Sequence, residues 1–135
     1  MHGQAWRCVV QRRACIADVA IAGESANAAP LSKAGMMWFV SHIFAKPEDA
    51  RDPRIDLYKK SDLRGLPPTI IINAATDPLR SDGDLLAAAL RQAKLMTVYK
   101  LHPGTAHEFF GMDKVVPNAS AAQKFAGEEL GKRLR

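Results

Sequence analysis

The sequence predicts an α/β fold with a parallel sheet and flanking helices. Two apolar runs that contain β-branched residues, 69–74 and 97–101, are each followed by a segment with helical periodicity, 81–94 and the residues from 118 onward. Strand and helix therefore alternate, which is the order typical of parallel sheets. Ligands bind such folds beyond the carboxyl ends of the strands, so we expect functional residues in the loops that follow strands.

The length and composition predict one folded domain over residues 1–135. The chain is 47% hydrophobic and 24% charged, values that exclude a disordered or collagen-like protein. No apolar run approaches the roughly 20 residues of a membrane-spanning helix, so we expect no membrane partner. The net charge of +5 leaves a nucleic-acid binder as one hypothesis. The basic residues are scattered and lack interleaved aromatic residues, which predicts no nucleic-acid partner.

The sequence contains two cysteines, Cys8 and Cys15. Two cysteines are too few for a disulfide framework or a zinc site. One local disulfide is an alternative, but we expect reduced thiols in a cytoplasmic protein. The short apolar run 15–22 follows several arginines but carries Asp18 at its centre, where a signal peptide has no charge. We therefore expect no export signal and a cytoplasmic location.

The first half of the chain contains one predicted strand and one predicted helix. Val19–Ala22 is a short apolar run that ends at a glycine, which indicates a buried strand and a tight turn. Ser32 is expected to cap a helix over 33–44 with a broad apolar face. The stretch 45–68 is rich in proline and charge and predicts a connecting loop, with a helical turn at 61–63.

The second half begins with the strongest strand signal in the chain. Three consecutive isoleucines within 69–74 indicate a strand that is covered on both faces. Ser81 or Asp82 is expected to cap the following helix, which runs to about Lys94. One apolar stripe of that helix is predicted to face the sheet: Leu86, Leu90 and Ala93.

The last two elements are a strand over 97–101 and a C-terminal helix, with a loop over 102–117 between them. Asn118 is expected to cap that helix. Its inner side is predicted to carry five apolar residues: Ala122, Phe125, Ala126, Leu130 and Leu134.

Three residues that could act together in acyl transfer each follow a predicted strand: Ser25, Asp77 and His107. A serine hydroxyl becomes a good nucleophile when a base takes its proton, and histidine titrates in the right range. A carboxylate on the other ring nitrogen fixes the tautomer and stabilises the imidazolium. Serine, aspartate and histidine also occur in the chain order that α/β-hydrolases use.

Residues 32–135 resemble the hormone-sensitive-lipase-like esterases, also called bacterial family IV lipolytic enzymes. The run Asp-Pro-Leu-Arg-Ser-Asp-Gly at 77–83 is similar to the acid motif of that family. The run His-Glu-Phe-Phe-Gly-Met at 107–112 is similar to its histidine motif, and Leu-Pro-Pro at 66–68 precedes a strand as in the family. The run Gly-Glu-Ser-Ala at 23–26 resembles its nucleophile elbow.

The resemblance implies a partial α/β-hydrolase-type sheet and a serine carboxylesterase that acts on short-chain carboxylic esters through an acyl-serine. It implies that Ser25 is the nucleophile, His107 the base and Asp77 the acid that orients the base. It also implies that the amide of Ala26 donates to the oxyanion. No metal or organic cofactor is implied. The substrate-binding residues that it implies are Trp38, Phe39 and Phe109.

The chain also departs from the family pattern. Asn27 stands where the elbow motif ends in glycine, and the residues that follow resemble a segment well beyond the elbow helix. The family's His-Gly-Gly-Gly oxyanion motif is not seen before Ser25. Losing one oxyanion donor typically costs about 10²–10³ in turnover. We therefore expect one truncated domain over 1–135, with 31–65 as a cap-like connecting segment, and a weak catalyst.

The main alternative is a non-catalytic remnant of the fold that acts as an interaction or scaffold module. A reduced sheet would expose an edge and apolar helix faces, so we expect a homo-oligomer. In this alternative Ser25 is a turn serine, Asp77 an ordinary residue at a helix start, and His107 a loop histidine packed on phenylalanines. A metal site that combines Asp77 and His107 with His102 is a further alternative, although its spacing fits no helical metal motif.

Overall fold

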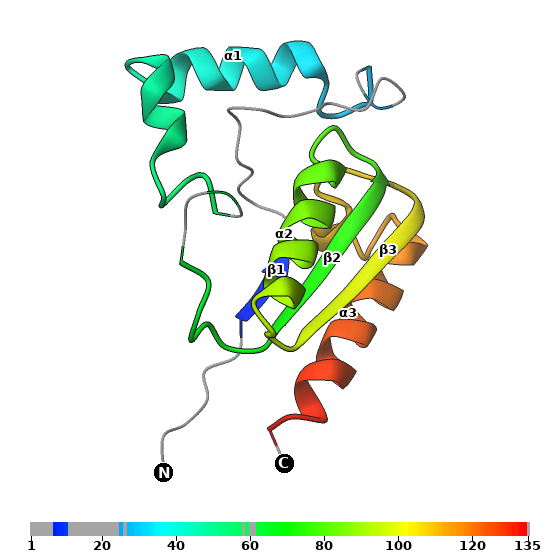
Figure 1. The fold of residues 1–135 in the computed structure, drawn as a ribbon. Helices are drawn as coiled ribbons and strands as arrows, with labels where there is room; N and C mark the ends of the chain where they lie inside the picture. The colour runs from blue at the N-terminus through cyan, green and yellow to red at the C-terminus, as the bar shows by residue number, and fades with distance from the viewer. Residues whose placement is uncertain (1–6, 11–24, 26, 58, 60–61, 135) are drawn as a thin grey trace.

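The computed structural model describes residues 7–10, 25, 27–57, 59 and 62–134. Among them is a three-stranded parallel sheet in the order β1 (Arg7–Val10), β2 (Thr69–Thr76) and β3 (Thr97–Ala106). Helix α2 (Arg80–Gln92) packs on one face of this sheet and α3 (Pro117–Gly131) on the other (Figure 1). The predicted α/β class with a partial parallel sheet is confirmed. The predicted strand Val19–Ala22 lies outside the described residues.

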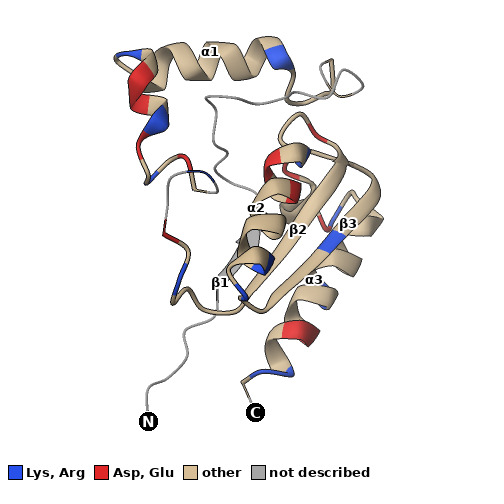
Figure 2. Cartoon of the chain, in the orientation of Figure 1, with Lys and Arg blue, Asp and Glu red and all other residues tan. Residues whose placement is uncertain are grey.

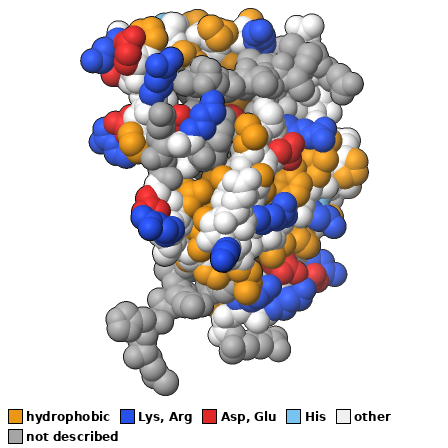
Figure 3. All heavy atoms as spheres, in the orientation of Figure 1, with side chains coloured by type: hydrophobic (Ala, Val, Ile, Leu, Met, Phe, Trp, Pro, Cys, Tyr) orange, Lys and Arg blue, Asp and Glu red, His pale blue; other side chains and the backbone are white. Residues whose placement is uncertain are grey.

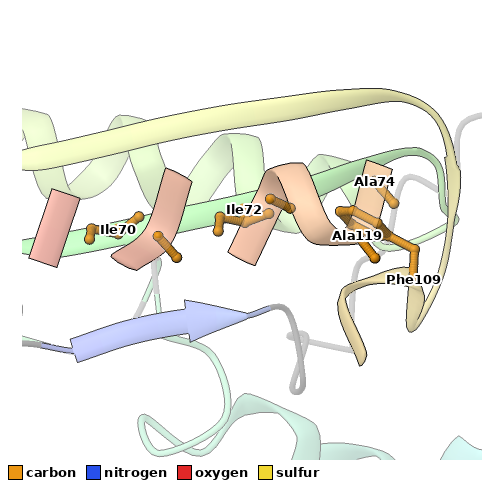
Figure 4. Packing of buried hydrophobic residues seen from close by; sticks show 7 residues of the cluster. Ile70, Ile72, Ala74, Phe109 and Ala119 are labelled. Atoms are coloured by element: carbon orange, nitrogen blue, oxygen red, sulfur yellow. The ribbon is translucent and has the colours of Figure 1, made fainter. Parts of the chain in front are cut away.

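Strand β2 is buried on both of its faces, as its three isoleucines predict. Ile70 and Ile72 point to the α3 side, where they pack with Phe109 and Ala119 (Figure 4). Ile71, which lies between them, packs on the other side against residues of α2. Each of the three isoleucines is 1% exposed. Alternate side chains of one strand therefore serve two separate cores.

Helix α2 begins earlier than expected, and the prediction that Ser81 or Asp82 caps it is wrong. The residue before the first helical residue is Leu79, whose side chain makes no capping hydrogen bond. The amide of Leu79 instead donates to Oδ1 of Asp77 over 2.8 Å, and this bond tightens the turn just ahead of the helix. The predicted apolar stripe is confirmed, because Leu90 is buried and Leu86 packs beside it.

Strand β3 extends to Ala106, so the prediction of a loop from residue 102 is wrong for the first five residues. Helix α3 begins at Pro117, and its Asn118 does not cap it as expected. The Asn118 amide instead donates to the carbonyl of Pro103 over 2.9 Å and ties the helix to β3. The predicted inner side of α3 is confirmed except for Leu134, which lies beyond the helix end and is exposed.

Helix α1 (Lys33–Ile43) confirms the helix expected after Ser32, whose hydroxyl accepts a hydrogen bond from the amide of Gly35 over 3.2 Å. Its only buried residue is Met36, which packs with Leu31, just before the helix, and with Leu79, between β2 and α2. Four other apolar side chains of α1 are exposed: Met37, Trp38, Phe39 and Ile43. Hydrophobic atoms accordingly cover part of the surface of this helix in Figure 3.

In its described residues, the connection between α1 and β2 contains one short element, the 3₁₀ helix η3 (Pro47–Arg51). Residues 62 and 63 are not helical, so the helical turn expected at 61–63 is wrong for the part that is described. Proline at the first position of η3 suits a helix start, because its missing N–H would have no partner there. None of the helices in the described ranges is long and apolar enough to cross a membrane.

Candidate active site

Asp77 and His107 lie together at the carboxyl end of the sheet. Thr76 of β2 pairs with Ala106 of β3, so the next residue of each strand emerges at the same edge. The ring nitrogen Nδ1 of His107 and the oxygen Oδ2 of Asp77 are 2.9 Å apart. Since a carboxylate can only accept, Nδ1 carries the proton and donates it. The two residues that the sequence assigns as acid and base are therefore hydrogen-bonded across 30 positions of chain.

Both oxygens of the Asp77 carboxylate have fixed partners. Oδ1 accepts from the amide of Leu79 at 2.8 Å, and Oδ2 accepts from His107. The residue is 3% exposed. A carboxylate held in this way cannot rotate without losing a hydrogen bond, so it orients the imidazole and keeps Nε2 free of a proton when the ring is neutral.

The surroundings of His107 favour its protonated form. The hydrogen bond that His107 donates to Asp77 raises the pKa of His107 above its usual value near 6.5. Burial opposes that rise, and the charges of Asp77 and Glu108 add to it. Because the folded-state pKa is raised, this pair stabilises the fold fully below the unfolded pKa. That stabilisation is lost as pH rises through the folded pKa. The neutral base that ester chemistry requires forms over the same rise in pH.

We predict that Asp77→Asn lowers the pKa of His107, because the substitution removes the charge that stabilises the imidazolium. The ring signals of His107 in a series of NMR spectra from pH 5 to 9 measure this directly. His42→Ala, which changes an exposed ring on α1, is the control and simplifies the spectra. An unchanged His107 midpoint in Asp77→Asn would contradict the pairing.

The loop that carries His107 is held by α3 on both of its sides. Gln123 donates from Nε2 to the carbonyl of Phe110 over 2.7 Å. Asn118 holds the carbonyl of Pro103 on the strand that leads into the loop. Between these two anchors, Glu108 has φ +65° and begins the 3₁₀ helix η4 (Phe109–Gly111). Two amide side chains of one helix therefore set the position of the imidazole.

Ser25 is 6% exposed, and its carbonyl accepts from the amide of Ala28 over 3.1 Å. Among the described residues, no hydrogen bond joins its hydroxyl to His107. Nε2 of His107 has the Glu108 carboxylate at 3.7 Å instead. The structure thus brings the acid and the base into contact and leaves the proposed nucleophile unjoined to them. Ala26, the expected oxyanion donor, lies outside the described residues.

The three expected substrate-binding residues occupy two different environments. Trp38 and Phe39 stand on α1, 58% and 47% exposed, with their rings in edge contact. Phe109 is buried in the core between the sheet and α3, where it packs on the ring of His102. Contact of these residues with a substrate stays a prediction.

His102 does not join a metal centre with Asp77 and His107. In the described part of the chain, no three side chains of His, Cys, Asp or Glu are grouped so that they could hold a metal ion. His102 is buried. Its pKa is lowered mainly by this burial and to a smaller extent by the charge of Lys100. A neutral imidazole in tilted contact with the ring of Phe109 fits a packing role in the core.

The sequence did not indicate the hydrogen-bonded side chains that hold the start of α2, just after the Asp77 loop. Asn73 of β2 donates to the carbonyl of Arg80 over 3.0 Å and to the hydroxyl of Tyr99 over 3.1 Å. That hydroxyl in turn donates to Asp84, and burial together with the Asp84 bond raises the pKa of Tyr99 to about 12. Gly83 gives Asn73 its space, since a Cβ there would lie 2.3 Å from the amide. The glycine in the 77–83 motif was the available signal.

Comparisons with known proteins identify the family of this chain. A family model described as the alpha/beta hydrolase fold matches residues 9–111. An ethyl acetate hydrolase of Pseudomonas putida is 28% identical over 97 residues, 72% of this chain and 30% of that enzyme. An acetyl esterase of Salmonella paratyphi A is 33% identical over 75 residues, 56% of this chain and 23% of that enzyme.

A solved ester hydrolase from the metagenome of Lake Arreo, bound to a bipyridine phosphonate derivative, superposes with a TM-score of 0.71 at 34% identity. The match covers 77% of this chain and 33% of that structure. The chain therefore spans less than a third of the curated relatives named above. The resemblance to the hormone-sensitive-lipase-like esterases is confirmed, and the chain belongs to the α/β-hydrolase fold family.

Proposed function

We propose that this chain is a serine carboxylesterase that hydrolyses short-chain carboxylic esters. In this proposal Ser25 attacks the ester carbonyl carbon while Nε2 of His107 takes the hydroxyl proton. The tetrahedral intermediate collapses, the bond to the alcohol oxygen breaks, and the imidazolium gives its proton to that oxygen. Water then attacks the acyl-serine with His107 again as base, and the acid is released.

The observation that carries the proposal is the hydrogen bond between His107 and Asp77 at the carboxyl end of the sheet. The carboxylate holds the ring with Nδ1 protonated, which leaves Nε2 as the base. The orienting carboxylate is 3% exposed, so bulk water competes little for its hydrogen bond to the ring. The named relatives are an ethyl acetate hydrolase and an acetyl esterase, and these names support small acyl and alcohol groups.

The proposal requires Ser25 to reach Nε2 when a substrate binds. Catalytic hydrogen bonds are often long or poorly aligned without substrate and tighten in the complex. Ser25 lies in a short turn that is closed by the hydrogen bond from the amide of Ala28 to the carbonyl of Ser25. A displacement of this turn that brings the Ser25 hydroxyl to Nε2 is therefore the movement that the reaction requires.

Helix α1 and its neighbours, within 31–65, are proposed to act as a cap-like segment. Met36 joins α1 to Leu79, which follows Asp77 by two residues, so the helix adjoins the acid loop. Trp38 and Phe39 are the aromatic residues that it could offer to an acyl chain. Its exposed apolar side chains also support the expected homo-oligomer, because such surfaces tend to be covered by a partner. The oligomeric state and the cytoplasmic location stay predictions.

Hydrolysis of p-nitrophenyl acetate tests the proposal. We expect turnover above the buffer rate that falls to background in Ser25→Ala and is unchanged in Ser41→Ala, which alters an exposed serine of α1. Circular dichroism and urea unfolding of both variants confirm that they are folded. Equal turnover in Ser25→Ala and the parent protein would refute the role of Ser25.

A further inference from the structure

Glu108 places a carboxylate beside the ring nitrogen Nε2 of His107. Its oxygen Oε1 lies 3.7 Å from Nε2, and its side chain is 59% exposed. The backbone of Glu108 is left-handed, a conformation that glycine or asparagine adopts more easily than glutamate. Residues in this conformation cluster at functional sites, and Glu108 directly follows the proposed base.

The reaction fixes which part of a substrate meets this carboxylate. Nε2 gives its proton to the oxygen of the departing alcohol, so that oxygen must come within hydrogen-bond reach of Nε2. Oε1 of Glu108, 3.7 Å from the same nitrogen, then lies within a few ångströms of the alcohol part of the ester. The acyl part extends from the carbonyl carbon in the other direction.

We propose that Glu108 is a specificity-determining residue that favours esters whose alcohol part carries a positive charge. The inference rests on the proposed esterase function and names the substrate class of that site. The other acidic group at the ring, Asp77, is buried and already paired with Nδ1, so Glu108 is the carboxylate left to meet a cation. Acidic residues, drawn in red in Figure 2, also occur in the β2–α2 loop and at the start of α2.

The expected preference is moderate because the side chain is exposed. At about 4 Å the attraction between unit charges in bulk water corresponds to a gain of about 5-fold in kcat/KM. The lower dielectric at a protein surface strengthens it, so for this exposed carboxylate we expect a gain of about 5–10-fold. Salt should weaken the preference, since exposed charges are screened. The overall charge of +5 repels cations at long range, so the preference must come from the local carboxylate.

Two acetate esters of matched shape test the proposal: acetylcholine and its uncharged analogue 3,3-dimethylbutyl acetate. The ratio of their kcat/KM values is measured for the parent protein, for Glu108→Gln and for the control Glu128→Gln, which removes an exposed carboxylate of α3. The ratio cancels any change in the pKa of His107, because both esters meet the same ring. At low salt we expect the ratio of kcat/KM for acetylcholine to that for the uncharged ester to be about 5–10-fold higher in the parent protein than in Glu108→Gln. We expect the ratio in Glu128→Gln to equal that of the parent protein.

Binding of the product alcohols separates this inference from the esterase proposal. Choline and 3,3-dimethylbutan-1-ol are titrated separately, and the ring signals of His107 report binding by NMR. Turnover with equal ratios in the parent protein and Glu108→Gln overturns the inference and retains the esterase. If no turnover is found but choline binds more tightly than 3,3-dimethylbutan-1-ol, and this difference is lost in Glu108→Gln, the esterase is refuted and the cation preference is retained. No choline-induced shift, or a shift of equal affinity in Glu108→Gln, overturns the inference.

Discussion

His107→Ala is expected to lower kcat for p-nitrophenyl acetate by about 10²–10⁴-fold, the usual contribution of a positioned general base. The substitution removes both the acceptor of the serine proton and the donor to the leaving alcohol. It also leaves Oδ2 of Asp77 without the hydrogen bond from Nδ1. Steady-state rates of the parent protein and the variant, measured over the same pH range, give the loss.

His42→Ala is the matched control for this prediction. His42 is an exposed histidine of α1 whose ring stacks on Trp38 and bonds to a backbone carbonyl of its own helix. Its removal should change kcat less than twofold, within the scatter of surface substitutions. A loss of less than about tenfold in His107→Ala, or an equal loss in both variants, would contradict the assignment of His107 as the base.

Gly83→Ala is expected to lower the free energy of unfolding by about 1–3 kcal/mol, the range for inserting a methyl group into a filled space. The new Cβ would lie 2.3 Å from both terminal atoms of the Asn73 amide, so that amide must move. Its movement strains the hydrogen bonds to Arg80 and Tyr99 that fix the start of α2. Urea unfolding followed by circular dichroism measures the change.

Gly127→Ala is the control for this prediction, because Gly127 also lies within a helix and a Cβ there would meet nothing within 4 Å. Alanine is the better helix former, so Gly127→Ala should be neutral or stabilising by up to about 1 kcal/mol. If Asn73 causes the clash, Asn73→Ala combined with Gly83→Ala should cost less than the sum of the two single changes. Equal stabilities of Gly83→Ala and Gly127→Ala would show that the space beside Asn73 is not filled.

The central part of the fold could be predicted because its signals are local. Three consecutive isoleucines leave few alternatives to a strand that is buried on both faces, and Ile70, Ile71 and Ile72 are each 1% exposed. The start of α2 could not be predicted, because it depends on the hydrogen bond between Asp77 and Leu79. The sequence indicates Ser81 as a good cap, but it does not show that a turn starts the helix two residues earlier, with Leu79 as the residue before it.

The same contrast applies to the site. Asp77 and His107 each follow a strand, and parallel strands deliver the next residues to one edge, so their contact could be expected from topology. The anchoring of the histidine loop by Asn118 and Gln123 could not, because it depends on how α3 lies across β3. The position of Glu108 depends on a left-handed backbone that no residue type in the loop requires.

The measurement that tests the central claim most directly is the site of reaction with a fluorophosphonate. Such a reagent forms a covalent bond to a serine oxygen as fluoride leaves, and only a serine activated by a base reacts quickly. We predict one adduct per chain, mapped by peptide mass spectrometry to Ser25, and formed at least 100-fold more slowly in His107→Ala, in line with the general-base contribution of roughly 10²–10⁴. An adduct at another serine, or none while the parent protein is folded, would contradict the account and favour a scaffold module that retains the fold without the chemistry.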